Sequence, residues 1–346
     1  MEDAVRRAKP ELTVRTELPL NLETHVERLV DDVTPVERFF VRSHGAVPAV
    51  DLASWRLDVR GLVHAPLSID HAALRALPSV TRTLMLECAG NGRAAYEPPA
   101  RGLAWGRGAV SQASWTGVLL ADLLGQVGIS PGGRHVRLEG ADPPVKDNPQ
   151  YLRSIPLEDV AARGVLLAWA MNGEPLTPAH GFPLRVVVPG WTGQHWMKWL
   201  TSIEVAATPS PGKFMADEYT LPGPGGGMAP IRGSRVKSLI ATPLEGETRS
   251  GDSVHVTGLA WAGEADIARV EISIDDGTTW LPARLRPGGQ GTWTRWNADV
   301  HAAGPGAITV LARATDTRGD TQPRRAEWNP MGYLWNGYDR VTLVPA

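Results

Sequence analysis

The single cysteine of the chain, Cys88, is the side chain with the most distinctive potential chemistry. It follows the apolar run at residues 83–87 and precedes the glycine-rich residues 89–92, with Arg93 directly beyond. This pattern predicts a buried strand that ends at the sulfur, beside a tight turn. A thiolate there could bind a soft metal or act as a nucleophile, and a nearby cation lowers the pKa of a thiol. Simple packing is the alternative, because free cysteines are among the most buried residues.

Four further segments place charged or aromatic side chains where loops and strand ends are expected. They are residues 39–44 (Phe-Phe-Val-Arg-Ser-His), 102–105 (Gly-Leu-Ala-Trp), 180–185 (His-Gly-Phe-Pro-Leu-Arg) and 196–199 (Trp-Met-Lys-Trp). Cations on separate segments suit a polyoxygenated anion, which arginine binds through two hydrogen bonds at once. Each segment alone is weak evidence, since a lone loop arginine is usually solvated and His180 is more often structural than ligating.

In the first part of the chain, both helices and strands are expected to position these residues. Apolar residues at helical spacing predict a helix over residues 117–127. Residues 68–78 predict a short helix with Ser68 or Asp70 as its N-cap. The β-branched run at residues 184–188 predicts a buried strand in a central position of a sheet.

The second part of the chain has a different pattern. Proline and glycine gather over residues 206–232, which predicts a long loop or an interdomain connection. Alternating residues at 253–261, 267–274 and 307–314 predict strands, with a hairpin turn at 275–277. Strands at such short intervals indicate a β-sandwich of immunoglobulin type, here without the cysteine pair of antibody domains.

The expected fold class is therefore α+β. We expect an N-terminal extension at residues 1–35, a mixed α+β domain at residues 36–232 and an immunoglobulin-like β-sandwich domain at residues 233–346. A chain of 346 residues and 37.2 kDa is long enough for two such domains.

The composition excludes several other functions. A single cysteine cannot form an internal disulfide, a multi-cysteine zinc site or an iron–sulfur cluster. The formal net charge of -2 lacks the basic excess typical of nucleic-acid-binding proteins, so no nucleic-acid partner is expected. No apolar run approaches the roughly 20 residues that cross a bilayer, so no membrane partner is expected either. Arg6 and Arg7 have no apolar stretch behind them, which predicts a cytoplasmic protein as given, or a periplasmic one if a leader has been removed.

In combination and order, these segments resemble the sulfite oxidase family of molybdenum enzymes, from about Phe39 to the C-terminus. The motifs that carry the resemblance are Phe-Val-Arg-x-His at 40–44, Glu-Cys-Ala-Gly-Asn-Gly-Arg at 87–93, Met-Asn-Gly-Glu-Pro-Leu at 171–176 and His-Gly-Phe-Pro-Leu-Arg-Val-Val-Val-Pro-Gly at 180–190. In the β-rich part, Asp-Asp-Gly-Thr-Thr-Trp at 275–280 and Trp-Asn at 328–329 look like the family's dimerisation domain. The resemblance implies a sulfite-oxidase-type molybdopterin domain, followed by an immunoglobulin-like domain that forms a homodimer.

The resemblance also implies a cofactor and a site. One molybdenum would be held by molybdopterin, a single pyranopterin dithiolene, with the soft thiolate of Cys88 completing the sulfur ligands. The residues that would bind the cofactor are Phe40, Val41, Arg42, Ser43, His44, Asp142, His180, Arg185, Trp196, Met197 and Lys198. The pocket beside the metal would trap a small oxyanion and would contain Arg42, Arg93, Trp105 and Tyr219. Without the resemblance, Asp142 would be an ordinary turn residue, and Trp105 and Tyr219 would be packing aromatics.

One position departs from the family pattern. Sulfite oxidases usually have a further pocket arginine in the segment that matches residues 328–332, where this chain has Met331. Eukaryotic nitrate reductases, which share the fold, typically have methionine there, but they tend to lack the tyrosine that Tyr219 supplies. A missing cation weakens the binding of a dianion more than that of a monoanion. The pocket therefore combines features of both kinds of enzyme.

The function that these observations favour is molybdenum-dependent oxidation of sulfite to sulfate by oxygen-atom transfer. Electrons would pass to an external acceptor such as a cytochrome, because the chain has no Cys-x-x-Cys-His haem-attachment motif. One alternative is a reductase of nitrate or of an S- or N-oxide on the same scaffold. Another is a non-catalytic binding or assembly protein with a vestigial cofactor pocket, against which Cys88 and the cofactor-side cations argue.

Overall fold

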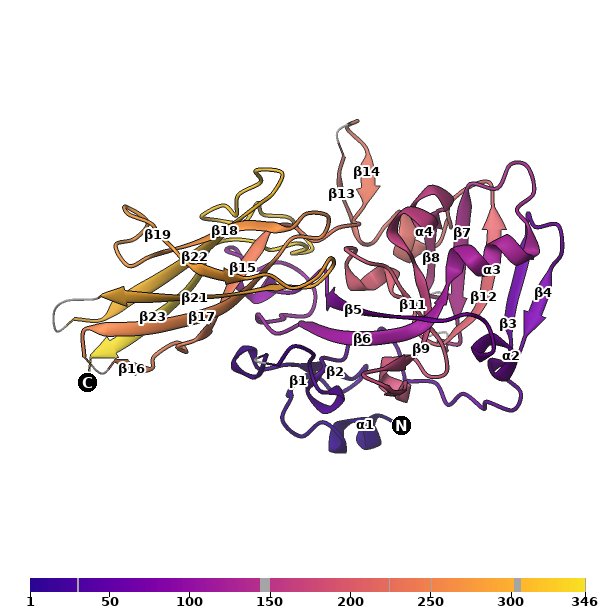
Figure 1. The fold of residues 1–346 in the computed structure, drawn as a ribbon, viewed down its shortest axis with the longest axis horizontal. Coiled ribbons are helices and arrows are strands. Elements are labelled where there is room, and N and C mark those ends of the chain that lie inside the picture. Colours follow the sequence, from indigo (N-terminus) through magenta and orange to yellow (C-terminus); the bar gives the residue numbers. More distant parts are fainter. Residues whose placement is uncertain (30, 144–149, 224, 250, 302–305, 346) are drawn as a thin grey trace.

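The computed structural model of the protein describes residues 1–29, 31–143, 150–223, 225–249, 251–301 and 306–345. Strands β15 to β23 form one end of the molecule, and the remaining elements form the other end (Figure 1). No helix among the described residues is long and apolar enough to cross a membrane.

Two five-stranded sheets build the larger end of the molecule. One has the order β10-β9-β6-β5, with β11 also paired to β9, and the other has the order β4-β3-β12-β7-β8. One apolar core joins side chains of both sheets, because each sheet turns its apolar face inward. The strands are β3 Leu57–Gly61, β4 Leu67–Ile69, β5 Val80–Glu87, β6 Val110–Leu119, β7 His135–Gly140, β8 Leu152–Pro156, β9 Leu166–Met171, β10 Glu174–Pro175, β11 Arg185–Val187 and β12 Leu200–Ala206.

The helices are short and lie mainly between the strands. They are α1 Glu2–Arg7, α2 His71–Arg75, α3 Leu120–Val127, α4 Leu157–Arg163 and α5 Lys213–Ala216. Helix α2 confirms one predicted helix, and the side chain of Asp70 caps it by accepting a hydrogen bond from the backbone N–H of Ala73 at 2.8 Å. Ser68 lies in β4 and is not the cap.

The predicted helix over residues 117–127 begins three residues later than expected, at Leu120. Residues 117–119 instead complete β6, where Gly117 is paired with Ala168 of β9. A Cβ atom on Gly117 would lie 2.1 Å from the carbonyl oxygen of Leu167, so this close strand pairing requires glycine. Sheet pairing therefore overrides the helical spacing of the apolar side chains at this end.

The strand predicted at residues 184–188 forms as β11, and its residues are fully buried as expected. Its central position was wrong, because β11 pairs with only one strand, β9. On the other side, single backbone hydrogen bonds join Val186 to Met197 at 2.7 Å and Leu184 to Leu200 at 2.9 Å. An irregular segment therefore covers the outer edge of β11, and that segment carries Lys198 into the site.

The first 35 residues pack against the mixed α+β part and take part in its hydrogen bonding. They contain α1 and the hairpin of β1 Thr13–Thr16 and β2 Asn21–Glu23. The Glu23 carboxylate accepts hydrogen bonds from the backbone N–H groups of Gly106 and Gly108, at 3.0 and 2.7 Å. The boundaries of the three predicted segments, at residues 35 and 232, stay predictions.

The predicted long connection at residues 206–232 has elements of its own. It contains α5 and a small hairpin of β13 Thr220–Pro222 and β14 Met228–Pro230. This hairpin projects from the molecule between its two ends (Figure 1). Tyr219 directly precedes the hairpin, so the connection carries a side chain that the sequence places in the site.

The smaller end is an immunoglobulin-like β-sandwich, which confirms the predicted fold class. Its two sheets have the orders β15-β17-β21-β20 and β16-β23-β22-β18-β19. The predicted hairpin forms between β18 and β19 across residues 275–277. The strands are β15 Lys237–Thr242, β16 Thr248–Arg249, β17 Ser253–Trp261, β18 Ile267–Ser273, β19 Leu281–Pro282, β20 Arg284–Arg286, β21 Thr294–His301, β22 Ile308–Asp316 and β23 Asp339–Pro345.

A buried ion pair joins the two ends of the molecule. Lys237 of β15 donates from Nζ to Oε1 of Glu87, at the end of β5, over 3.0 Å, and both side chains are almost completely buried. The indole N–H of Trp261 donates to the other carboxylate oxygen of Glu87 at 2.9 Å. Because Glu87 directly precedes Cys88, this contact fixes the strand end that carries the sulfur.

Candidate active site

Cys88 directly follows β5, as the sequence predicts, and it lines a cavity among the described residues. The backbone N–H of Cys88 donates to the carbonyl oxygen of Ala109 at 2.9 Å, which continues the pairing of β5 with the chain before β6. The backbone N–H of Gly90 points at the sulfur, with 3.5 Å between nitrogen and sulfur. The thiol therefore stands at a strand end, buried but open to the cavity.

The turn after Cys88 depends on glycine. Gly92 has a φ of 87°, which is in the left-handed region that favours glycine. A Cβ atom there would lie 2.6 Å from the ring of Trp335, which belongs to the segment before β23. The tight turn thus lets a distant part of the chain approach the Cys88 loop.

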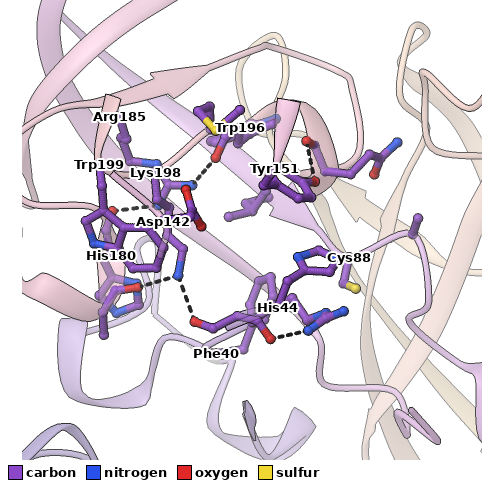
Figure 2. Close-up of a pocket in the computed structure, with 18 of the residues that line it drawn as sticks. Phe40, His44, Cys88, Asp142, Tyr151, His180, Arg185, Trp196, Lys198 and Trp199 are labelled. Carbon is purple, nitrogen blue, oxygen red and sulfur yellow. Dashed lines mark hydrogen bonds between the residues drawn. The ribbon is translucent and has the colours of Figure 1, made fainter. Parts of the chain in front are cut away.

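The cavity brings together most of the residues that the sequence singles out. Its walls include Phe40, Arg42, Ser43, His44, Cys88, Asp142, His180, Arg185, Trp196, Met197, Lys198 and Tyr219. Figure 2 shows Cys88 and His44 on one side of the pocket, and His180, Lys198 and Trp199 on the other. The pocket therefore has a thiol side and a cation-rich side.

Arg42 and Tyr219 lie on the thiol side. Arg42 Nη1 donates to Oδ1 of Asn21 at 3.3 Å and also to the carbonyl oxygen of Ser43. The Tyr219 hydroxyl and His44 Nε2 form a hydrogen bond of 2.7 Å. Burial, reinforced by neighbouring cations of which Arg42 has the largest influence, holds the pKa of His44 well below its usual value. The imidazole beside the Tyr219 hydroxyl is therefore neutral.

The protonation of Cys88 differs from the prediction that a nearby cation would lower its pKa. Burial raises the pKa of the thiol above its ordinary value, because desolvation outweighs the opposing charge of Arg42 and the smaller one of Arg93. The cations act in the predicted direction, but the sequence does not reveal the depth of the sulfur, and burial decides the net direction of the shift.

Tyr219 has an unusual backbone. Its φ of 57° lies in the left-handed region, where a bulky side chain is rare. Its ring stacks on that of Tyr333, with 5.1 Å between centroids. Trp199, another cavity residue, has a φ of 52°. Strained non-glycine residues tend to cluster at functional sites, and here they turn two aromatic side chains into one cavity.

The cation-rich side is formed by Lys198 and Arg185. Lys198 Nζ donates to Ser43 Oγ at 3.0 Å and to the carbonyl oxygen of Ala179 at 3.1 Å. Arg185 is 3% exposed and donates only to backbone carbonyls, those of His180 at 3.0 Å and Trp196 at 3.3 Å. Burial lowers the pKa of Arg185 to about 9 and that of Lys198 to about 7. The hydrogen bonds described for both cations go to neutral groups, and the Asp142 carboxyl acts on Lys198 through its charge, so both cations are suited to an anionic ligand.

Several polar atoms in this wall have no hydrogen-bond partner within the described residues. They include His180 Nε2, Arg185 Nε and Asp142 Oδ2. Buried polar atoms are normally paired, so unpaired ones in a cavity wall indicate a polar ligand. A pterin with a phosphate group would offer these atoms hydrogen-bond donors, hydrogen-bond acceptors and negative charge as partners. The residues present thus fit the cofactor that the sequence implies.

The metal would depend on that cofactor for its remaining ligands. Across the described parts of the chain, no three His, Cys, Asp or Glu side chains are grouped to hold a metal ion. Cys88 would then be a single protein ligand, and the other sulfur ligands would come from the dithiolene.

Four predicted residues do not line the cavity. Val41 is buried, and its backbone pairs with Leu22. Trp105 is fully buried behind the wall, with its ring edge-on to Phe40 at 6.3 Å between centroids. Arg93 and Met331 lie together to one side of the cavity, as described next. These residues support the wall of the cavity without forming its inner surface.

The guanidinium of Arg93 is engaged by the backbone. Its Nε donates to the carbonyl oxygen of Met331 at 2.7 Å, and its Nη1 donates to that of Leu103 at 2.8 Å. The Met331 side chain is half-buried and packs on an apolar cluster that includes Tyr219 and Tyr333. The segment around Met331, where this chain departs from the family pattern, therefore packs against the cluster that contains Tyr219.

The structure adds residues to the site that the sequence analysis missed. Tyr151 lines the cavity, with its ring 4.6 Å from that of His44 and its hydroxyl donating to the carbonyl oxygen of Gln194 at 2.9 Å. Asn21 accepts hydrogen bonds from Arg42 and from the backbone N–H of Ser43. No spacing pattern indicates Tyr151 or Asn21, whereas Trp199 stands in a segment that the sequence did single out.

Comparison with known proteins covers both parts of the chain. Residues 44–214 match the family described as oxidoreductase molybdopterin binding domain, and residues 229–345 match the Mo-co oxidoreductase dimerisation domain. A sulfite oxidase of Arabidopsis thaliana is 35% identical over 371 residues, which cover 96% of this chain and 94% of that protein.

Two further matches have different names. The solved structure of sulfane dehydrogenase SoxCD from Paracoccus pantotrophus is 29% identical and superposes with a TM-score of 0.81, over 93% of this chain and 84% of that one. A nitrate reductase [NAD(P)H] of Hordeum vulgare is 34% identical over 94% of this chain, which spans 41% of its length. The similarity to each extends over nearly the whole chain described above.

Proposed function

Because the chain belongs to the sulfite oxidase family of molybdenum enzymes, we propose that it oxidises sulfite to sulfate. It is a molybdenum oxidoreductase whose cofactor is molybdopterin. The proposed reaction is SO3²⁻ + H2O → SO4²⁻ + 2H⁺ + 2e⁻, so two electrons must pass to an acceptor. When bound, the cofactor supplies the two-electron chemistry of oxygen-atom transfer, and the protein supplies orientation and charge.

The observation that carries the proposal is the meeting of a thiol, a guanidinium and a phenol hydroxyl in one cavity. Cys88, Arg42 and Tyr219 line the same pocket, although they come from three distant segments. Arg42 would bind the oxyanion and partly neutralise it, since a guanidinium can donate two parallel hydrogen bonds to oxygen. Tyr219, fixed by its hydrogen bond to His44, would orient the same anion.

The cation-rich side of the pocket would hold the pterin and its phosphate. Arg185, Lys198 and His180 would bind them. Within the described part of the chain, neither Arg185 nor Lys198 forms an ion pair with a carboxylate, and one ring nitrogen of His180 has no hydrogen-bond partner. Asp142 lies on the same side, where burial raises the pKa of its carboxyl group to about 6 against the opposing charge of Lys198. A carboxyl group that accepts a proton readily could serve as either donor or acceptor toward the pterin ring.

A reductase on the same scaffold is the second candidate. Met331 and the similarity to a nitrate reductase favour it, whereas Tyr219 in the cavity favours sulfite oxidation. Two negative charges on sulfite suit a pocket that holds Arg42 beside other buried cations. We therefore rank sulfite above nitrate as the substrate.

A parallel assay with artificial electron carriers tests this ranking on the molybdenum-loaded protein. The kcat/KM for sulfite oxidation is expected to exceed that for nitrate reduction by at least about tenfold, or ~1.4 kcal/mol of transition-state stabilisation. A higher value for nitrate would contradict the proposal. Protein from a molybdenum-replete host that holds neither metal nor pterin would favour the non-catalytic alternative.

We further propose that the enzyme is a homodimer and that its acceptor is a cytochrome. The match of residues 229–345 to a dimerisation domain supports the dimer. Light scattering on the full chain is expected to give twice the 37.2 kDa of one chain. A mass of one chain at micromolar concentration would contradict this arrangement. Reduction of a cytochrome in step with sulfite consumption would identify the class of acceptor.

A further inference from the structure

Arg153 is a buried cation that the proposed function does not use. It lies on β8, opposite Leu138 of β7, and its side chain is completely buried. Its guanidinium carbon lies 5.7 Å from the centroid of the Tyr219 ring, within the range of a cation–π contact. Arg153 therefore stands directly behind a wall of the candidate active site.

The guanidinium has almost no partners for its five donors. Its Nη2 lies 3.0 Å from Nε2 of His195, but the same ring nitrogen lies 2.8 Å from the carbonyl oxygen of Ile231. One ring nitrogen either accepts a hydrogen bond or donates one, so it satisfies only one of these two contacts. Arg153 Nε and Nη1 have no hydrogen-bond partner among the described residues.

Among the residues that the structure describes, tyrosines surround the Arg153 guanidinium and no carboxylate forms an ion pair with it. Burial lowers the pKa of Arg153 below its ordinary value, and the groups around it include Tyr151, Tyr219 and Tyr333, which are neutral because burial raises their own pKa values. Burying a cation without a counter-ion is strongly unfavourable. Folding alone gives no reason to keep an arginine at this position, where an apolar side chain would pack without that cost.

The cavity supplies such a reason. Tyr151 and Tyr219 line it, and the charge of Arg153 also acts on His44 in the same wall. The Tyr219 hydroxyl bonds to His44 in the cavity wall, so an anion beside that hydroxyl would lie close to the charge of Arg153, in surroundings where charges are only weakly screened. Met331, which packs against the apolar cluster that contains Tyr219, has an uncharged side chain.

We propose that Arg153 is a positioning residue for the substrate oxyanion, supplying positive charge from behind Tyr219 and fixing the ring that faces the anion. This inference rests on the proposed function, in which an oxyanion binds beside Cys88. It predicts that Arg153 lowers the stability of the fold and strengthens the binding of a dianion.

The first test compares Arg153→Met with the wild-type holoenzyme. The KM for sulfite is expected to rise about tenfold or more, because a weakly screened charge is lost, with a smaller change in kcat. The melting temperature is expected to stay the same or rise, because an unpaired buried cation is removed. Arg137→Met, on the adjacent β7 with its side chain partly exposed, is the control for the KM and is expected to leave it unchanged. Its melting temperature is expected to fall slightly, because Arg137 loses its hydrogen bonds to Thr208 and Pro209.

The second test uses sulfate as a probe that requires no turnover. Sulfate is expected to raise the melting temperature of the wild-type holoenzyme more than chloride at equal ionic strength, and Arg153→Met is expected to lose most of this difference. Arg153→Lys, which retains the charge, is expected to keep most of the sulfate effect and a KM within about threefold of wild type, since lysine still provides a cation.

Three results would overturn the proposal. An unchanged KM and sulfate effect in Arg153→Met would show that the charge does not reach the anion. A structural role would be shown if the melting temperature of Arg153→Met fell and Arg153→Lys lost as much sulfite affinity and sulfate stabilisation as Arg153→Met. Failure of both Arg153→Met and Arg153→Gln to fold would show the same. Molybdenum-loaded wild-type protein that does not oxidise sulfite would instead contradict the proposed function, while the sulfate measurement would still test Arg153.

Discussion

Replacing Cys88 by serine is expected to abolish nearly all turnover while leaving the protein folded. Serine is almost the same size as cysteine, so the end of β5 should pack as before. A hydroxyl is a far poorer ligand for a soft metal than a thiolate. We expect kcat to fall by much more than tenfold, a loss above ~1.4 kcal/mol in activation free energy.

The control measurements concern cofactor content and a second variant. The pterin should remain largely bound in Cys88→Ser, because Arg185 and Lys198 lie on the opposite side of the pocket from the sulfur (Figure 2). Cys88→Ala separates ligation from packing, since alanine is apolar but cannot bind the metal. If either variant keeps more than about a tenth of the wild-type kcat, Cys88 is not the ligand.

Replacing Lys237 by methionine is expected to have the largest effect on stability. The change leaves the Glu87 carboxylate buried without its cation, although Trp261 and Asn91 still donate to it. Breaking a buried ion pair from one side typically costs about 3–5 kcal/mol. The melting temperature and the urea midpoint should both fall clearly.

Two further variants show whether the effect belongs to the buried pair. Arg235→Met removes a nearby ion pair with Glu327, whose side chain is 80% exposed, and is expected to cost at most about 1 kcal/mol. Adding Glu87→Gln to Lys237→Met should recover part of the lost stability, because no buried charge then remains. Equal melting temperatures for Lys237→Met and Arg235→Met would contradict the role assigned to this contact.

Much of the fold follows from local patterns in the sequence. The strand that ends at Cys88, the short helix capped by Asp70 and the alternating strands of the β-sandwich each depend on residues close together in the chain. The errors come from long-range pairing. Residues 117–119 join a sheet because β9 lies beside them, and β11 lies at a sheet edge because an irregular segment covers its other side.

In the candidate site too, local sequence patterns were predictive and long-range contacts were not. The family resemblance assigns Arg42, Lys198 and Tyr219 to one site, and the structure brings all three to one cavity. The sequence could not show that Arg93 is held by backbone carbonyls, because Met331 and Leu103 meet it only after folding. It could not indicate Arg153 either, since an arginine in a strand is usually exposed and only the tertiary structure reveals its burial.

The left-handed backbone of Tyr219 also bears on how this pocket persists through evolution. Glycine, asparagine and aspartate accept a φ of 57° more easily than tyrosine, which bears a cost of about 1–2 kcal/mol there. Under neutral drift, such a position would exchange tyrosine for one of these residues, because the fold would gain stability. Tyr219 therefore occupies a position where the fold alone would favour a smaller residue.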